Sequence, residues 1–202
     1  CNQKIDLFIG RISGTILHYE IVDPKAAVPS FRLVNERFQD LLIVTGQGSR
    51  HGANTMAFAD HDRDGDLDLF WGDFFEAGLL LFENTGSCRE PRLRQEGVRF
   101  PLNAPVITSG YNAPAFADLD GDQQLDLVLG VLGGAYDPIR TSIANLHYFS
   151  SAARGQWAHQ TDQLLTMIDV GSEAIPSVVD LDGDGDQDLV VANKIGPLER
   201  AT

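Results

Sequence analysis

The chain has 202 residues, and its 29 acidic against 15 basic side chains give it a formal charge of −14. This charge argues against nucleic acid as a partner, because the phosphate backbone is bound mainly through Lys and Arg. Hydrophobic residues make up 43% of the chain, which is typical of a folded globular protein. The longest apolar run covers only residues 127–135, well short of the roughly 18 to 20 residues that cross a bilayer. The sequence therefore predicts no transmembrane span.

The two cysteines, Cys1 and Cys88, are too few for a disulfide scaffold and are not spaced as zinc ligands. The sequence starts at Cys1 without an initiator Met or a signal peptide. It is therefore expected to be a processed form whose precursor carried a signal peptide, or a piece of a longer chain. A lipid anchor at Cys1 is an alternative, and the disulfide or lipid state of both cysteines stays open.

Short β-like runs separated by Gly, Pro, Asn and Ser follow one another along the chain. No stretch shows the 3.6-residue period of an amphipathic helix, so the sequence predicts an all-β fold. Along the first part of the chain the predicted strands are residues 5–9, 14–21, 30–37, 55–59, 67–72, 78–82, 91–96 and 113–117. Two less regular loops are expected at residues 47–52 and 133–142.

A segment with a dense acidic front half and an apolar back half recurs in the chain. Residues 59–72 read ADHDRDGDLDLFWG, and related segments occur at 117–130 and 179–192; residues 5–10 are the back half of a fourth copy. The aspartates that mark the copies lie about 60 residues apart, at Asp6, Asp68, Asp126 and Asp188. The approximate repeats are 1–59, 60–117, 118–179 and a partial 180–202.

Four strands in each repeat describe the four-stranded antiparallel blade of a β-propeller, an architecture that closes with roughly 4 to 8 blades. The chain supplies about three blades plus partial ones. The two ends do not complement each other, because Ile5 to Gly10 and Gln187 to Ala192 are the same strand of the repeat. We therefore expect an open arc of a larger propeller, completed by a longer chain or by other chains.

The acidic front halves have the pattern of cation-binding loops. Numbered from the first aspartate, acids stand at positions 1, 3, 5 and 9 of each loop. Two carboxylates about 4 Å apart repel by roughly 4 kcal/mol at an effective dielectric of 20, so an empty loop should be splayed or carry raised carboxylate pKa values. Oxygen ligands in a flexible loop favour Ca²⁺ over Mg²⁺ or zinc. An EF-hand is excluded, because position 12 is Trp71, Leu129 or Val191 where that motif needs Glu.

The Asp-x-Asp-x-Asp-Gly-x-x-Asp loops, the Phe-x-Gly and Leu-x-Gly strands after them, and Asn112-Ala-Pro before Phe116 resemble FG-GAP/VCBS repeats. These are the blade repeats of integrin-α-type propellers, and Glu83-Asn-Thr-Gly86 matches their usual strand end in bacterial members. The resemblance covers nearly the whole chain. It implies about three Ca²⁺ ions, one in each complete loop, held by side chains at positions 1, 3, 5 and 9 and by the carbonyl at position 7. The implied residues are Asp60, Asp62, Asp64, Asp66 and Asp68; Asp118, Asp120, Asp122, Gln124 and Asp126; and Asp180, Asp182, Asp184, Asp186 and Asp188.

The middle loop has Gln123 at position 6, where the other two loops have glycine. If this position is left-handed, a residue other than glycine costs roughly 1 to 2 kcal/mol, and the middle site should then be weaker. The ions are expected to connect strands and to perform no chemistry.

No catalytic constellation is visible in the remaining sequence. The five histidines are interpreted as ordinary strand residues outside any metal motif: His18, His51, His61, His147 and His159. Trp71 is expected in the core, whereas Phe74 and Phe75 fit either the core or an exposed surface that stacks on a sugar or anchors a partner.

These observations favour a calcium-stabilised β-propeller without catalysis that acts as a binding or assembly module. Its partner would be a protein or a carbohydrate on the loop face, contacted by irregular loops such as 133–142. One alternative is a secreted propeller enzyme such as a polysaccharide lyase or hydrolase; another is a structural subunit of a larger surface assembly. Loops of this type bind Ca²⁺ at roughly 10⁻⁴ to 10⁻³ M in extracellular modules, so an extracellular, periplasmic or cell-surface location is expected.

Overall fold

The structure, a computed structural model, describes residues 5–43, 54–73, 76–131, 144–152, 156–165 and 173–193. Within these ranges the chain forms strands and a single 3₁₀ turn, η1 (Phe38–Asp40), with no α-helix. None of the described residues belongs to a helix that is long and apolar enough to cross a membrane. The strands are β1 (Asp6–Gly10), β2 (Ile16–Ile21), β3 (Phe31–Asn35), β4 (Asn54–Ala59), β5 (Asp68–Asp73), β6 (Leu79–Phe82), β7 (Val98–Phe100), β8 (Ala113–Ala117), β9 (Asp126–Gly130), β10 (Leu146–Ala152), β11 (Gln156–Thr161), β12 (Ile175–Val179) and β13 (Asp188–Ala192).

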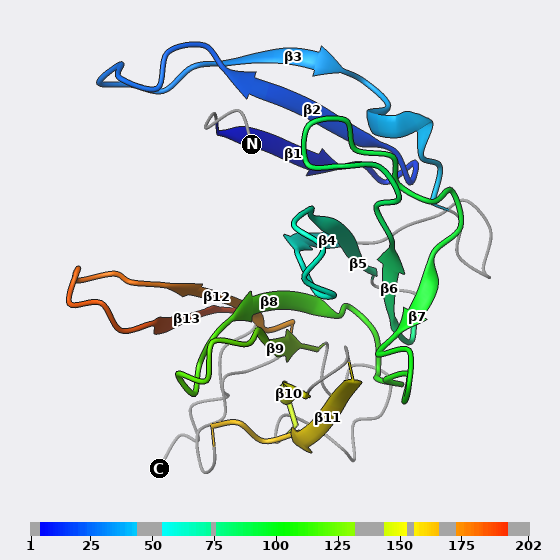
Figure 1. Cartoon of the computed structure of the whole chain (residues 1–202), viewed down its shortest axis with the longest axis vertical. Helices are drawn as coiled ribbons and strands as arrows, with labels where there is room; N and C mark the ends of the chain where they lie inside the picture. The colour runs from blue at the N-terminus through cyan, green and yellow to red at the C-terminus, as the bar shows by residue number, and fades with distance from the viewer. Residues whose placement is uncertain are drawn as a thin grey trace, which may run out of the picture.

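The strands form four separate antiparallel sheets, which confirms the all-β prediction (Figure 1). The two middle sheets are four-stranded meanders, β4-β5-β6-β7 and β8-β9-β10-β11. The first sheet has three strands, β1-β2-β3, and the last described sheet has two, β12-β13. Strand β4 contacts β8, and β8 contacts β12, so the first strands of successive sheets lie side by side.

Each acidic segment joins the first two strands of a sheet. Strand β4 pairs with β5 across the loop at 60–67, from Asn54 opposite Asp73 to Ala59 opposite Asp68. The same hairpin recurs as β8–β9 and β12–β13. The sheets therefore recur with the same period as the sequence repeat. Each sheet begins with the strand that precedes an acidic loop, whereas each sequence repeat begins with the loop itself.

The predicted strand at 91–96 is wrong, because β7 lies at 98–100. Residues 83–94 instead form a short turn-back, in which the Thr85 amide donates to the Arg92 carbonyl at 2.9 Å and the Arg94 amide donates to the Glu83 carbonyl at 2.9 Å. The buried side chain of Asn84 holds this turn, because its Oδ1 accepts hydrogen bonds from the amides of Gly86 and Arg92. Side-chain to backbone bonds of this kind compete with ladder pairing.

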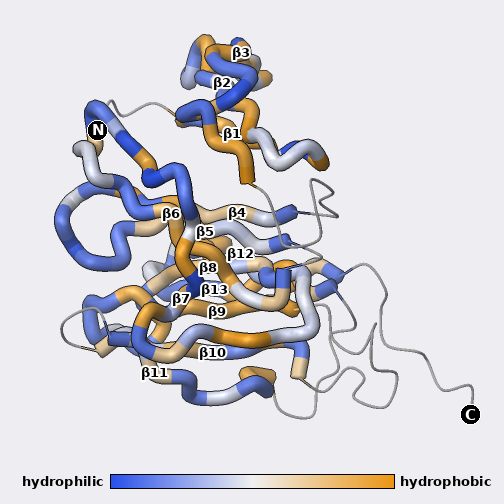
Figure 2. Tube along the Cα trace, turned by 90° about the vertical axis from the view of Figure 1, so that its right-hand side faces the viewer, coloured by the Kyte–Doolittle hydropathy of each residue, from blue (hydrophilic) through white to orange (hydrophobic). Residues whose placement is uncertain are grey.

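The core lies between the faces of neighbouring sheets. In β5, Leu69 and Trp71 pack toward the β1-β2-β3 sheet, while Phe70 packs with Leu127 of the β8-β9-β10-β11 sheet. All four side chains are fully buried. Successive side chains of a strand point to opposite faces, so a continuous apolar run is required wherever a strand is covered on both sides. In Figure 2 the hydrophobic segments lie mainly in the strands of the stacked sheets, and many hydrophilic segments lie in the connections.

Two glycines at the ends of the central strands permit neighbouring sheets to approach closely. A Cβ on Gly72 would collide with the carbonyl oxygen of Asn112, just before β8. A Cβ on Gly130 would collide with the carbonyl oxygen of Ala174, just before β12. The glycine that closes each apolar run is thus required by the contact with the next sheet, and its counterpart in the last copy is Ala192.

The end sheets use the same strand motif with much less cover. Strand β1 corresponds to β5 in the repeat, yet Leu7 and Ile9 are 38% and 43% exposed, whereas Leu69 and Trp71 are fully buried. Among the described residues, β1 pairs only with β2, and β13 pairs only with β12. Within the described part of the chain, both end sheets therefore have an edge without a further strand and an incompletely covered face.

Candidate metal centre

The three acidic loops share one hydrogen-bond framework. In the first loop the Asp60 carboxylate accepts from the Gly65 amide at 3.1 Å, Asp62 accepts from the Asp64 amide at 3.3 Å, and Asp64 accepts from the Asp66 amide at 3.0 Å. The bonds from position 6 to 1, from 5 to 3 and from 7 to 5 recur in both other loops. Short acidic side chains at alternating positions thus fold the backbone into the same turn three times.

Positions 4 and 6 of each loop have left-handed backbone. Position 6 has φ of 93° at Gly65, 66° at Gln123 and 97° at Gly185. The condition under which Gln123 carries a backbone cost is therefore met. Position 4 is left-handed as well, with Arg63 at φ 66° in the first loop and glycines in the other two. The first and the middle loop consequently each hold one residue with a Cβ in a conformation that favours glycine.

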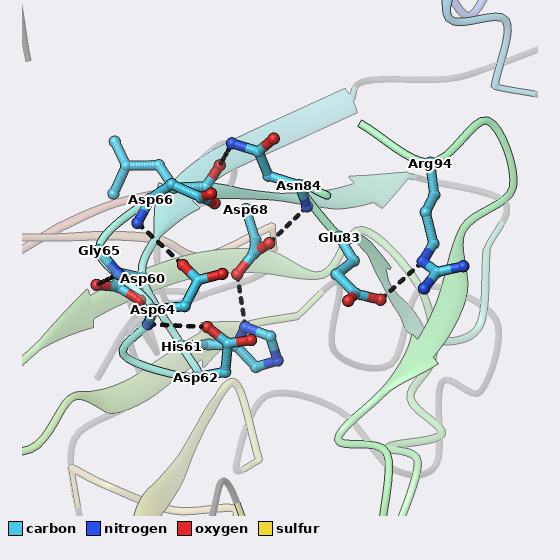
Figure 3. A network of polar contacts seen from close by, with 11 residues as sticks. Asp60, His61, Asp62, Asp64, Gly65, Asp66, Asp68, Glu83, Asn84 and Arg94 are labelled. Carbon is cyan, nitrogen blue, oxygen red and sulfur yellow. Dashed lines mark hydrogen bonds and ion pairs between the residues drawn. The ribbon is translucent and has the colours of Figure 1, made fainter. Parts of the chain in front are cut away.

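The first loop gathers carboxylate oxygens around its centre (Figure 3). Oxygens of Asp60, Asp62 and Asp64 all lie within 4.8 Å of one another. Two carboxylate oxygens of this loop also lack a hydrogen-bond partner: Oδ1 of Asp60 and Oδ1 of Asp66 are buried and accept no hydrogen bond. Buried polar atoms nearly always have a hydrogen-bond partner. These two oxygens have none within the protein, so they are suited to bind a ligand.

Burial, and then the crowding of acids, raises carboxylate pKa values in the first and the middle loop. The pKa of Asp66 is raised by its burial and then by the negative charge of Asp64 and of the other acids in the loop. The pKa of Asp62 is raised by burial and by Asp64. In the middle loop, burial, with a contribution from Asp120 and Asp122, raises the pKa of Asp126. A divalent cation among these groups would reverse this repulsion.

The acid at position 9 makes a different set of contacts in the first loop. Oδ2 of Asp68 lies 2.6 Å from Nδ1 of His61, and Oδ1 of Asp68 accepts a hydrogen bond from the Asn84 amide at 2.7 Å. Both His61 and Asp68 have almost no exposed side chain. Burial lowers the pKa of His61, but the hydrogen bond and charge of Asp68 outweigh it, and the pKa is raised. Asp68 thereby connects the loop to β6 and its following turn.

The equivalent acids in the other loops bind the backbone at position 2. Oδ2 of Asp126 accepts from the Leu119 amide at 2.9 Å, and Oδ2 of Asp188 accepts from the Leu181 amide at 2.9 Å. Asp126 also accepts a hydrogen bond from the Tyr148 hydroxyl, and burial together with the charge of Asp126 raises the pKa of Tyr148 to about 12. The position-9 acids therefore fix the loops to the sheets.

The structure places all fifteen sequence-predicted residues at the three equivalent hairpins, but it does not bring each set of five together. The tight groups are Asp60, Asp62 and Asp64 in the first loop, Asp118, Asp120 and Asp122 in the second, and Asp180, Asp182 and Asp188 in the third. In the second loop the side chain of Gln124 donates to Asp122 at 2.7 Å. Each group is an all-oxygen donor set, and such a set fits a hard cation.

The sequence did not predict three side chains that contact the position-9 acids or the loop. His61 was interpreted as an ordinary strand residue outside a metal motif, and this is wrong: it stands at position 2 of the first loop, in a group with Asp62 and Asp68. The signal was that the other loops have leucine at this position. Asn84 lies in the Glu83-Asn-Thr-Gly86 strand end, a motif that the sequence does show, whereas Tyr148 lies in β10 without a sequence signal of its role.

The other residues singled out by the sequence have separate outcomes. His18, His147 and His159 lie in strands β2, β10 and β11, as predicted. Trp71 is fully buried, which confirms its place in the core. Cys88 is disulfide-bonded. The remaining predictions concern residues outside the described ranges: Cys1, His51, Phe74, Phe75 and the loops at 47–52 and 133–142.

In comparisons with known proteins, no family model and no curated protein matches this sequence.

Proposed function

We propose that this protein is a calcium-stabilised segment of a β-propeller, an open arc of a larger ring with Ca²⁺ in its three acidic loops, and that it acts outside the cytoplasm as a binding or assembly module. The observation that carries the proposal is the repeated acidic hairpin. Three loops with the same hydrogen-bond framework stand at the same joint of three sheets. A single acidic turn has many explanations, whereas three turns with the same hydrogen bonds favour a shared ligand.

The arrangement of the sheets supports a propeller arc. The first strands β4, β8 and β12 lie side by side, and the sheets pack face to face through separate cores. This is the relation between blades that surround an axis. The uncovered strands β1 and β13 support completion by further strands, either in a longer chain or in partner chains. A module of this kind is suited to assembly, because its open edges are templates for pairing.

The proposed metal residues act as ligands and connect strands. In the first and the middle loop the carboxylates at positions 1, 3 and 5 would hold the ion and the position-9 acid would fix the loop to its sheet, whereas in the third loop Asp180, Asp182 and the position-9 acid Asp188 form the group that would hold it. In each loop position 7 would contribute its backbone carbonyl. The ion supplies charge neutralisation to a cluster that otherwise repels itself. The chain's own residues contribute the turn, the left-handed positions and the contact to the neighbouring strand.

Two features support an extracytoplasmic location. The disulfide at Cys88 is of a kind that persists in oxidising compartments. Loops of this type bind Ca²⁺ at roughly 10⁻⁴ to 10⁻³ M, so they would be filled outside a cell. The partner class that we propose is a protein or a carbohydrate.

Calcium-dependent unfolding tests the proposal. At a Ca²⁺ concentration about ten to a hundred times the dissociation constant, one site stabilises the fold by roughly 1.4 to 2.7 kcal/mol. In a chain of this size this corresponds to a rise in Tm of about 3 to 10 °C for each site. The measurement compares the full chain in Ca²⁺, in Mg²⁺ and in EGTA, and a Tm that is the same in all three would refute the calcium role.

A pair of variants in the third loop separates ligation from charge. Asp182 and Asp186 are both exposed, and the side chains of both would become neutral amides. Asp182→Asn alters a proposed ligand, while Asp186→Asn leaves the proposed carbonyl ligand in place. We expect Asp182→Asn to lose part of the Ca²⁺-dependent rise in Tm and to melt no lower than the wild type in EGTA, since it relieves repulsion. Equal losses in both variants would contradict the ligand assignment.

A further inference from the structure

A pocket of about 810 Å³ lies between the first two sheets, and its lining reaches Leu67 of the first acidic loop and Asn84, whose amide binds Asp68. One wall is the β1–β2 hairpin, and the other is formed by β4 and by the segment that follows β6. The two walls are connected at one end by η1, where the side-chain amide of Gln39 donates to the Pro91 carbonyl at 2.9 Å. Gln95 donates in turn to the Gln39 carbonyl at 3.1 Å. The pocket is thus a built feature of the packing between two sheets.

The hairpin wall has an aromatic half and an acidic half. In the β1–β2 register Phe8 lies opposite His18, and Asp6 lies opposite Glu20. Residues two apart on a strand, and residues directly opposite across a pair, share one face of the sheet. All four side chains line the pocket.

The aromatic half is a set of rings in contact. The ring of Phe8 stacks on that of His18 with centroids 4.7 Å apart and planes 6° apart. Phe38 lies 4.9 Å from Phe8 at a steep angle, and Phe58 lies 4.7 Å from Phe8 on the opposite wall. The negative faces of such rings attract a cation within about 6 Å.

The acidic half provides a carboxylate for that cation. Glu20 is paired with Arg32 at 3.3 Å, whereas the only ion-pair partner of Asp6 among the described residues is His18, whose Nε2 lies 3.5 Å from Asp6 Oδ1. Nε2 of His18 is buried and makes no hydrogen bond. Arg89 is a cationic side chain in the same lining, but the charge of −14 on the whole chain adds a field that favours cationic ligands over anionic ones.

We propose that this pocket binds a small organic ammonium ion, with the charged nitrogen near Asp6 and the carbon groups on that nitrogen against the rings of Phe8, His18 and Phe58. The pocket would be the ligand site of the binding module proposed above, and to that extent the inference rests on that proposal. The residues proposed to contact the ligand are not among the carboxylates of the acidic loops, although Leu67 of the first loop also lines the pocket, so the site and the calcium role can fail separately.

A pair of isosteric ligands tests the charge requirement. Choline has a positively charged quaternary nitrogen where 3,3-dimethylbutan-1-ol has a neutral quaternary carbon. We expect choline to give saturable shifts of the His18 ring signals in NMR titrations, with an affinity about tenfold higher than that of the neutral alcohol. The titrations use the full chain with saturating Ca²⁺ at constant ionic strength, so that the acidic loops do not compete for the cation. Equal affinities, or no saturable shift with choline, would overturn the proposal.

Matched variants then locate the site. Asp6→Asn removes the proposed partner of the nitrogen, and Asp23→Asn makes the same charge change at an exposed residue in the connection between β2 and β3 that does not line the pocket. We expect Asp6→Asn to weaken choline binding about tenfold and Asp23→Asn to leave it unchanged. Phe8→Leu, which keeps an apolar side chain, should weaken binding severalfold. Equal effects of the two Asp→Asn variants would overturn the assignment.

The two proposals give distinguishable failures. Asp182→Asn in the third acidic loop is expected to bind choline as the wild type does. If choline binding is lost in Asp6→Asn and the melting temperature does not respond to Ca²⁺, the pocket stands and the metal role falls. If the melting temperature responds to Ca²⁺ and choline shows no saturable binding, the metal role stands and the pocket falls.

Discussion

The contact between Gly72 and the segment before β8 permits a direct test of how the sheets pack. A Cβ at residue 72 would meet the carbonyl oxygen of Asn112, and this backbone cannot easily move. The side-chain amide of Asn112 donates to the Glu76 carbonyl at 2.7 Å and to the Gly78 carbonyl at 3.1 Å, and its side chain is fully buried. Gly72→Ala must therefore separate the two sheets locally.

The expected cost follows from these contacts. Overpacking a well-packed site costs roughly 1 to 3 kcal/mol. The Thr55 hydroxyl donates to the same Asn112 carbonyl at 3.0 Å, and losing that bond adds about 1 kcal/mol. Gly72→Ala should therefore lower the free energy of unfolding by about 2 to 4 kcal/mol. In urea this moves the unfolding midpoint of a domain of this size down by about 1 M.

A second glycine provides the matched control. Gly121 in the middle loop has φ of 79°, and a Cβ there would have no atom within 4 Å. Gly121→Ala should then cost only the left-handed backbone penalty, about 1 to 2 kcal/mol. Both variants are measured by urea unfolding at one Ca²⁺ concentration. A cost for Gly72→Ala equal to or below that for Gly121→Ala would refute the close packing of the two sheets.

The other predictions concern the middle loop and a buried histidine. Gln123→Gly relieves a φ of 66° and should raise the free energy of unfolding by up to about 1 kcal/mol, and with it the urea midpoint, whereas Gln124→Gly, at a position without positive φ, should lower both; the same sign for both variants would contradict the strain argument. Burial and then the nearby His159 lower the pKa of His147, against a smaller opposing effect of Asp162. The unfolded chain therefore takes up a proton that the folded chain does not, and stability is full above about pH 6.5 and falls as the pH drops through that value. His147→Gln should remove the contribution of His147, so that the urea midpoints at high and low pH differ less than in the wild type. An unchanged difference would contradict the role of His147.

Much of the candidate site was predictable because its determinants are local. Aspartates at alternating positions bind the amides two to five residues away, and this alone specifies the turn. The left-handed position 6 follows from glycine in two of three copies. The pair of His61 and Asp68 was not predictable in the same way, because it depends on a buried space between sheets that Phe70 and Phe100 line.

The sequence by itself determined the all-β class, the repeat period and the acidic hairpins, since each depends on contacts within a few residues or on alternation along one strand. The tertiary structure decided how much each copy of the same motif is buried. The motif Asp-Leu-Phe occurs in β1 and in β5, yet Leu7 is 38% exposed and Leu69 is fully buried. It likewise decided that residues 83–94 turn back on themselves and that Phe8, His18 and Phe58 surround one pocket. Burial depends on which sheet lies across each face, and that relation joins residues far apart in the chain.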